Sequence, residues 1–258
     1  MGWLGKGLVL KSKKNYEEAL VCFEKALVGW VYEEALVQKG AVLNSLERYK
    51  EATECLLKAL EENKTNSRTW NYLGLSYRGS DQVQKAFESY DESIRLDKEF
   101  ICPLYNKGTL FAELQRNDEA IACFKEVLRR NDAHLSSLNN LGLVYSSLNE
   151  PESSLEYLEK CLKVKPDFLH AWFNKGWVYK GLGLDLKALE CFDVVIRIDG
   201  NFERAWMEKG ILLERMERIS EALSCYDRVL RINPKNMDAI TRKANLTNLL
   251  EPPIQNGI

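Results

Sequence analysis

A glycine recurs along this sequence at a nearly constant spacing, and this recurrence constrains the fold more than any other feature. Consecutive members of the series lie 33 residues apart once and 34 residues apart five times: Gly7, Gly40, Gly74, Gly108, Gly142, Gly176 and Gly210. Ala or Ser follows each glycine after twelve residues, and Phe, Leu or Tyr comes four residues later. Seven copies in one register predict a repeat protein in which each copy is one supersecondary unit.

The segments between these glycines predict helices rather than strands. No run alternates Val, Ile or Thr with polar residues in the manner of a half-buried strand. Every proline lies in the first turn of a predicted helix, in a turn between repeats or after the last helix: Pro103, Pro151, Pro166, Pro234, Pro252 and Pro253. The chain is therefore predicted to be all-α.

The register resembles that of the tetratricopeptide repeat (TPR) family, whose unit is a helix–turn–helix of 34 residues. We number the recurring glycine as position 8 of each repeat. The family's Trp at position 4 is then matched by Trp3, Trp70, Trp172 and Trp206, and its Tyr at position 11 by Tyr77, Tyr145 and Tyr179. Its Pro at position 32 is matched by Pro166 and Pro234. The resemblance covers essentially the whole chain and implies an α-α superhelix, which is a solenoid of antiparallel helix pairs. The implied boundaries are 1–32, 33–66, 67–100, 101–134, 135–168, 169–202 and 203–236 for seven repeats, 237–250 for a C-terminal capping helix and 251–258 for a tail.

The two ends of the predicted solenoid differ in character. The last helix is expected to pack through Ile240 and Ala244 and to present a polar outer face, as a capping helix does. The first helix carries Leu4 and Leu8 without such a cap, so it is expected either to follow further chain or to pack against a partner. The short apolar turn around Trp30 has no predicted role.

Composition and charge narrow the classes of function. A net charge of −2 provides no basic surface for nucleic acid or for an anionic membrane. No apolar run approaches the roughly 18 residues that span a bilayer, and the N-terminus lacks the pattern of a signal peptide. With 45% hydrophobic and 29% charged residues, the chain is expected to be a folded, cytoplasmic protein.

Signatures of catalysis and of cofactor binding are absent from the sequence. It contains no HExxH, no paired Cys-x-x-Cys, no phosphate-binding glycine-rich loop and no nucleophile elbow, so we expect no enzymatic activity, no cofactor and no metal site. His134 is expected to be a solvated surface residue, and His170 to line the concave side.

Two other recurring residue types have ordinary structural interpretations. Five repeats carry Lys before the glycine, at position 7, where the stem would cover apolar surface while the ammonium stays in solvent. Five cysteines share position 23 and are interpreted as reduced, small hydrophobic residues: Cys22, Cys55, Cys123, Cys191 and Cys225.

One side of the first helix of each repeat carries residues that repeat packing does not require. Positions 2, 5, 6, 9 and 13 lie opposite the packing positions, and in the TPR family they line a concave surface that binds extended peptides. Eleven of the fourteen residues at positions 5 and 9 are apolar, which indicates an exposed strip that binds a partner. Phe173 and Trp177 are therefore expected to meet a ligand. The alternative is a tight superhelical winding that buries position 9 against position 5 or 2 of the next repeat.

Position 6 carries asparagine in three consecutive repeats, Asn106, Asn140 and Asn174. This row resembles the asparagine ladder of the O-linked N-acetylglucosamine transferases, in which amides hold a peptide backbone; solvated asparagines are the alternative. The family's carboxylate clamp for chaperone C-termini is not expected, because no Lys or Arg occupies position 5, 6 or 9 of any repeat. The predicted peptide-binding surface consists of Asn71, Tyr105, Asn106, Asn139, Asn140, Leu143, Phe173, Asn174, Trp177, Met207 and Ile211.

These features predict a non-enzymatic scaffold that binds a protein or peptide partner through apolar anchors in the concave groove. Two alternatives stay open. One is a structural protein that self-associates into a homo-oligomer through the apolar strip and the first helix. The other is a TPR accessory or targeting domain of a larger enzyme or regulator.

Overall fold

The structure is a computed structural model that describes residues 2–28 and 32–250. Over these residues the chain forms α-helices and no β-strand. The helices are α1 Trp3–Ser12, α2 Tyr16–Lys25, α3 Tyr32–Ser45, α4 Tyr49–Glu62, α5 Ser67–Gly79, α6 Val83–Leu96, α7 Ile101–Glu113, α8 Asn117–Arg130, α9 Leu135–Ser147, α10 Pro151–Val164, α11 Leu169–Gly181, α12 Asp185–Ile198, α13 Glu203–Arg215, α14 Ile219–Ile232 and α15 Met237–Leu250. Trp30, Pro252, Pro253 and the tail 251–258 lie outside the described residues.

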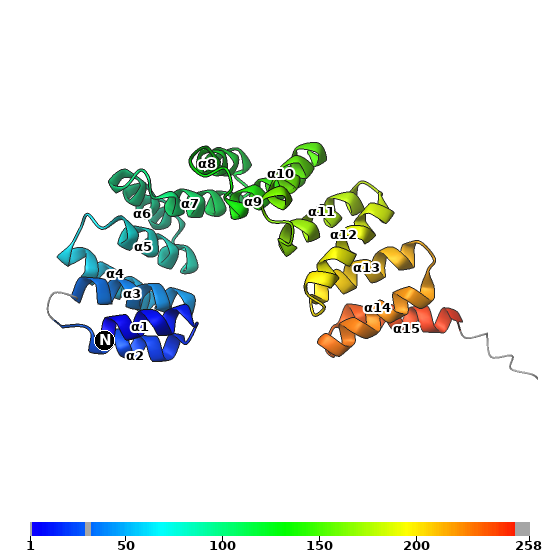
Figure 1. The fold of residues 1–258 in the computed structure, drawn as a ribbon, viewed down its shortest axis with the longest axis horizontal. Coiled ribbons are helices and arrows are strands. Elements are labelled where there is room, and N and C mark those ends of the chain that lie inside the picture. Colours follow the sequence, from blue (N-terminus) through cyan, green and yellow to red (C-terminus); the bar gives the residue numbers. More distant parts are fainter. Residues whose placement is uncertain (1, 29–31, 251–258) are drawn as a thin grey trace, which may run out of the picture. The chain divides into compact units, whose positions relative to one another are not determined.

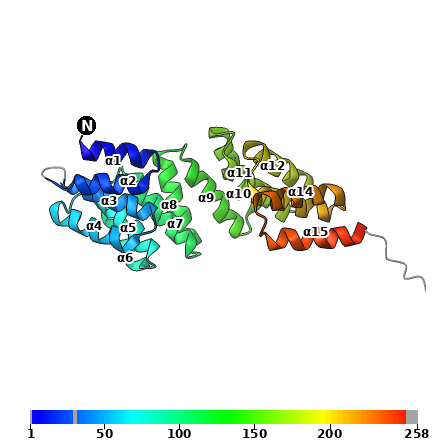
Figure 2. The same cartoon turned by 90° about the horizontal axis from the view of Figure 1, so that it is seen from below.

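The helices gather into two compact units, residues 1–132 with α1 to α8 and residues 133–258 with α9 to α15. Within each unit, consecutive helices pack as antiparallel pairs, helix A and helix B of one repeat, and each helix B also contacts the next helix A (Figures 1 and 2). The predicted fold class, an all-α repeat of helix pairs, is confirmed. None of the described helices is both long and apolar enough to cross a membrane.

The recurring glycine makes room for a large side chain of helix B. A Cβ atom at Gly74 would lie 2.4 Å from Cε1 of Tyr90, and one at Gly210 would lie 2.6 Å from Cε1 of Tyr226. In every repeat the nearest ring or branched side chain is the large residue at position 24. A side chain at position 8 would therefore displace the core of its own repeat, which explains why glycine recurs there.

The turn between helices A and B places one residue of each repeat in the left-handed region. Position 15 has a φ between 57° and 71° in all seven repeats: Lys14, Glu47, Asp81, Gln115, Asn149, Gly183 and Glu217. The following N–H returns to a carbonyl five residues back, as from Gln82 to Tyr77 over 2.8 Å, and so closes helix A. Six of these residues adopt this conformation at a steric cost that glycine would avoid.

The single helix α15 covers the last repeat through residues other than those predicted. Ile240 and Ala244 are exposed, whereas Ala239 and Leu246 are buried. Ile240 and Ala244 stand at positions 4 and 8, which in the other repeats face helix B of the same repeat, and the described part of the chain contains no such helix after α15. Ala239 and Leu246 stand at positions 3 and 10, which pack on the preceding repeat. The prediction of Ile240 and Ala244 as packing residues was wrong for this reason.

Lysines at position 7 join neighbouring repeats by a contact that we call the 7–25 ion pair. Each ammonium lies 2.5 to 3.0 Å from an acidic residue at position 25 of the preceding helix B: Lys39–Glu24, Lys107–Asp91, Lys175–Glu159, Lys209–Asp193 and Lys243–Asp227. Of the five lysines whose ammonium groups were predicted to stay in solvent, Lys6 is exposed, whereas the prediction is wrong for the other four, because the adjacent helix brings a carboxylate within reach. Each pair is partly exposed and stabilises the stacking by roughly 0–1 kcal/mol.

The cysteines at position 23 lie at or near the core. Cys22, Cys191 and Cys225 are buried, Cys55 and Cys123 are half-buried, and all are free thiols. Burial raises the pKa of the Cys123 and Cys191 thiols to about 11, so both are neutral at pH 7. Their environment is that of the small hydrophobic residues expected from the sequence.

Candidate functional site

The residues predicted to line the peptide-binding face differ in their burial. Those at position 5 are largely covered: Asn71, Asn139, Phe173 and Met207 are buried, and Tyr105 is half-buried. Those at position 9 keep more of their surface, with Leu143 exposed by 45%, Trp177 by 47% and Ile211 half-buried. The asparagines at position 6 are half-buried. The strip that was expected to be exposed is therefore buried at most of these position-5 residues and exposed at Leu143 and Trp177.

Phe173 is a core residue rather than an exposed anchor. Its exposed fraction is 5%, and its ring centroid lies 5.6 Å from that of Phe192 and 5.4 Å from that of Phe202. The guanidinium of Arg204 covers the ring at 4.7 Å. The expectation that the fold does not need Phe173 was wrong, because α13 and the turn before it close over position 5. The same applies to Met207, which belongs to the same buried cluster.

Two asparagine pairs connect neighbouring repeats. Asn106 donates through Nδ2 to Oδ1 of Asn71, and Asn174 donates through Nδ2 to Oδ1 of Asn139, each over 2.8 Å. The donor stands at position 6 and the acceptor at position 5 of the preceding repeat. These amides therefore hold one repeat to the next, a role that the comparison with an asparagine ladder did not predict. Asn140 accepts a long contact of 3.4 Å from Asn139.

Trp177 remains exposed in the second unit and borders a small cavity, which we call the Trp177 pocket. Its indole stacks on Phe173 with centroids 6.5 Å apart, and the Lys180 ammonium lies 4.8 Å from its ring centroid. Lys180 is held in turn by Glu208 at 2.5 Å. The cavity of about 210 Å³ is lined by Ser146, Asn149, Pro151, Trp177, Val178, Gly181 and Leu182. This volume suits one apolar side chain of a ligand.

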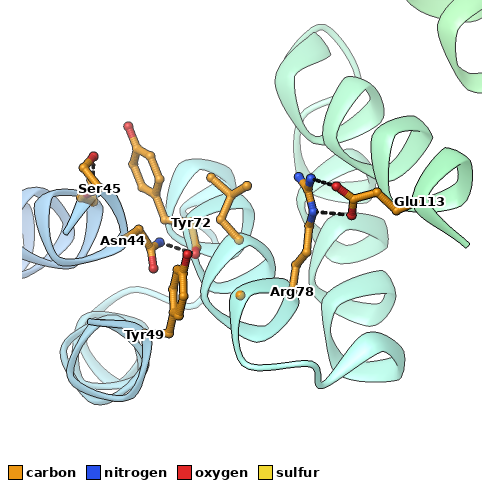
Figure 3. A pocket seen from close by; sticks show the side chains of 9 residues that line it. Asn44, Ser45, Tyr49, Tyr72, Arg78 and Glu113 are labelled. Carbon is orange, nitrogen blue, oxygen red and sulfur yellow. Dashed lines mark hydrogen bonds and ion pairs between the residues drawn. The ribbon is translucent and has the colours of Figure 1, made fainter. Parts of the chain in front are cut away.

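The first unit contains a second cavity, the Tyr49 pocket, whose lining residues are drawn in Figure 3. Its volume is about 520 Å³, and it is lined by Ala41, Asn44, Ser45, Tyr49, Tyr72, Leu75, Arg78, Gly79 and Glu113. Asn44 donates to the backbone oxygen of Tyr72 over 2.9 Å and accepts from Ser76 over 2.7 Å. Arg78 forms a two-point ion pair with Glu113 at one side of the cavity.

Both pockets are built from the same repeat positions. Each uses positions 12 and 17 of one repeat and positions 9 and 13 of the next, which places Tyr49 and Pro151 in equivalent sites. Sequence reasoning missed position 17 because it considered only helix A, whereas position 17 begins helix B. The available signal was glycine at position 13, since a Cβ at Gly79 would lie 2.3 Å from Cε1 of Tyr49.

The two histidines differ from each other in exposure. His134 was expected to be solvated, but it is half-buried, and its Nδ1 accepts the N–H of Ser137 over 3.2 Å at the start of α9. Burial lowers the pKa of His134, which favours the neutral ring that can accept this bond. His170 is exposed and lies beside the rings of Phe168 and Phe202.

These stacked helix pairs define a helical repeat protein, and comparison with known families is consistent with this class. Three family profiles described as "Tetratricopeptide repeat" match the chain, one over residues 2–27, 33–66 and 169–202, one over 99–167 and one over 203–236. Together these matches extend over more than half of the sequence. The chain belongs to the tetratricopeptide repeat family.

Solved structures share the fold at low sequence identity. YrrB, described as a TPR protein with an unusual peptide-binding site, is 24% identical over 74% of this chain and 99% of its own, with a TM-score of 0.56. PilF of Pseudomonas aeruginosa is 20% identical over 83% of this chain and 97% of its own, with a TM-score of 0.70. MamA is 25% identical over 62% of this chain and 94% of its own, with a TM-score of 0.55. No curated protein sequence matches this chain.

Proposed function

We propose that this protein is a non-enzymatic interaction scaffold that binds an extended segment of a partner protein, with the Trp177 pocket as its main anchor point. The observation that carries the proposal is the exposed indole of Trp177 beside a cavity sized for one side chain. Exposed aromatic residues next to small pockets are typical anchor sites in protein interfaces. The TPR fold and the peptide-binding site ascribed to YrrB support the same general role.

The residues of the predicted face contribute in different ways under this proposal. Trp177 and Leu143 contact the ligand, whereas the buried ring of Phe173 stacks against the indole of Trp177. The amide N–H group of Asn174 holds neighbouring repeats together, so a backbone N–H group of the ligand would meet its Oδ1 atom. The ligand segment would thus be held by one apolar side chain and by its backbone.

The experiment that tests this role combines peptide selection with a pair of matched variants. Dodecapeptides selected from a phage-displayed random library on the full chain would be titrated by calorimetry. Trp177→Glu should weaken binding at least tenfold, because it removes the anchor surface. Leu186→Glu is the control, since Leu186 is 65% exposed in the same unit but lies outside the pocket. Equal affinities for both variants would contradict the proposal.

Self-association is a second candidate, favoured by the surface of α1. Trp3, Leu8 and Val9 are each exposed by 40% or more on this one helix. Exposed apolar side chains of this kind are common contacts between copies of a chain. Light scattering from micromolar to near-millimolar concentration would detect it. A mass that rises in the wild type and stays monomeric in Leu8→Glu/Val9→Glu would establish this candidate, and a monomer at every concentration would exclude it.

A further inference from the structure

Helix α1 exposes a side that is buried in every later helix A. Positions 3 and 10 are buried in α3, α5, α7, α9, α11, α13 and α15. In α1 these positions hold Gly2 and Val9, and both are exposed, Val9 by 46%. We call Gly2, Lys6, Val9 and Lys13, at positions 3, 7, 10 and 14, the α1 face. Their spacing of three or four residues places them along one side of the helix.

Lys6 makes one of the two contacts that its counterparts make. In a later repeat, the Lys175 ammonium lies 5.5 Å from the ring centroid of Trp172 and 3.0 Å from a carboxylate oxygen of Glu159. The Lys6 ammonium lies 5.5 Å from the ring centroid of Trp3, but it has no ion-pair partner among residues 2–28 and 32–250. Lys6 is therefore oriented for a 7–25 ion pair whose acidic member is missing from the described chain.

The charge around the α1 face is positive. Helix α1 contains no acidic residue, and Lys13 at its end is exposed. The Lys25 ammonium of α2 lies 4.5 Å from the ring centroid of Trp3, next to Lys6. Four carboxylates of α2 and α3, the helices packed on α1, already have partners: Glu17 with Arg48, Glu24 with Lys39, Glu33 with Asn63 and Asn66, and Glu34 with Gln38.

Glu18 is the remaining acidic residue of α2, and its position in the repeat directs it away from the α1 face. It stands at position 19. Its counterpart in the second repeat, Glu51, lines a cavity together with Gly79 and Ser80 of the third repeat. Position 19 therefore lies on the side of the following repeat, and the α1 face favours an acidic occupant.

The helices that contribute the acidic member of the 7–25 ion pair show what such an occupant looks like. In α6, Phe87 packs against Phe111 of α7 with ring centroids 4.6 Å apart, and Asp91 pairs with Lys107. Ile94 follows at position 28, so the helix carries an apolar, an acidic and an apolar residue at positions 21, 25 and 28. The other four helices of this kind have the same pattern: Leu20, Glu24 and Leu27; Leu155, Glu159 and Leu162; Leu189, Asp193 and Ile196; Leu223, Asp227 and Leu230.

We infer that the α1 face is a docking site for an amphipathic helix of another protein that carries the pattern apolar-x-x-x-acidic-x-x-apolar. The acidic side chain pairs with Lys6, and the apolar side chains pack on Val9 and on the exposed indole of Trp3. A second folded copy of this chain does not offer such a helix, because all five of its acidic residues at position 25 are paired within their own chain. The site shares no residue with the Trp177 pocket, so it is independent of the function proposed there.

A peptide that copies α6 is the probe for this face. Residues 83–96, acetylated, amidated and labelled with fluorescein, contain the pattern and no cysteine. Fluorescence anisotropy with the full chain should show binding of this peptide. A peptide with Asp91→Lys should bind roughly tenfold more weakly, because it places a second ammonium group against Lys6. No binding of the first peptide, or equal binding of both, would overturn the inference.

Variants of the full chain locate the binding. Lys6→Glu should reverse the preference, so that the Asp91→Lys peptide binds more tightly than the original. Val9→Asp should weaken the original peptide roughly tenfold, because a carboxylate would face its apolar side chains. Both residues are exposed, so thermal melting should be unchanged in the two variants.

Two controls separate this face from other parts of the chain. Lys107→Glu changes position 7 in another repeat, and Trp177→Glu changes the pocket of the proposed function; both should bind the peptide as the wild type does. Loss of binding in either control but not in Lys6→Glu would refute the α1 face. A chain that dimerises through Val9 without peptide would place a second copy on this face and would also refute the inference.

Discussion

The phenol ring of Tyr49 lies against the bare Cα of Gly79, so closely that a Cβ there would come within 2.3 Å of its Cε1 atom. This contact joins the start of α4 to the end of α5 and forms one wall of the Tyr49 pocket. Gly181 stands at the same repeat position in the second unit, yet a Cβ there would meet no atom within 4 Å. Glycine is therefore sterically required at position 79 but not at position 181, although both residues stand at position 13 of their repeats.

Alanine substitutions at these two glycines should have opposite effects. Gly181→Ala should stabilise the protein by up to about 1 kcal/mol, because alanine favours the helix over glycine and fills open space. Gly79→Ala should destabilise it by about 1–3 kcal/mol, because Tyr49 must move. Urea unfolding monitored by circular dichroism measures both. In a Tyr49→Ala background the penalty at Gly79 should disappear, and its persistence there would contradict this account.

Phe173 and Trp177 should differ sharply in their contribution to stability although they are four residues apart. Phe173→Ala should lower the free energy of unfolding by about 3–5 kcal/mol, as for other buried aromatic residues. Trp177→Ala should change it by about 1 kcal/mol or less, because about half of its surface already faces solvent. Comparable losses in the two variants would mean that Trp177 belongs to the core and would remove the basis for a binding role.

The Asn139–Asn174 hydrogen bond should appear as a coupling between two repeats. Each single alanine variant should cost about 1–2 kcal/mol, because it leaves the partner amide without its hydrogen bond. The double variant should cost less than the sum by an amount on the order of 1 kcal/mol. A double-mutant cycle in urea measures this difference, and strictly additive losses would show that the bond contributes nothing to stacking.

The left-handed residues at position 15 offer stabilising substitutions. Gln115→Gly and Glu217→Gly should each stabilise the protein by up to about 1 kcal/mol, because glycine adopts a positive φ without the clash of a Cβ. Gly183→Ala, at the same position, should destabilise it by about 1–2 kcal/mol. The midpoints of thermal unfolding of the three variants provide the comparison. Shifts of the same sign at all three sites would exclude this explanation.

His134 should make the stability of the protein fall on acidification. Burial lowers its pKa below the ordinary value of 6.5, so the unfolded chain takes up the proton first. The contribution of the neutral ring is fully present above about pH 6.5 and is lost as the pH drops through the lower folded pKa. His134→Asn keeps an acceptor for the Ser137 N–H without titrating, so it should lose less stability between pH 7 and pH 5. Identical pH profiles in urea would indicate that another group is responsible.

Structural features that arise within a single repeat could be predicted from the sequence. The match between glycine at position 8 and a large residue at position 24 is a steric fit within one helix pair, so it recurs seven times and predicts the pairs directly. The last described helix, α15, spans Met237–Leu250. The left-handed turn was not predicted, because six of its seven residues are not glycine and carry no distinctive signal.

The candidate site was predicted less well because it depends on how one repeat lies against the next. Positions 5 and 9 are only about 40° apart around helix A, so periodicity assigns Phe173 and Trp177 to the same face. Tyr49 was missed because it reaches the pocket from helix B of the preceding repeat, where the sequence analysis placed no site residue.

The sequence by itself thus determined the helices, their pairing and the register of their core, since these are set by contacts within about 34 residues. Only the tertiary structure decided which apolar residues are covered. The covering helix comes from a neighbouring repeat, and its position follows from the packing of many side chains rather than from any local pattern. That packing buries Phe173 and leaves Trp177 at the surface.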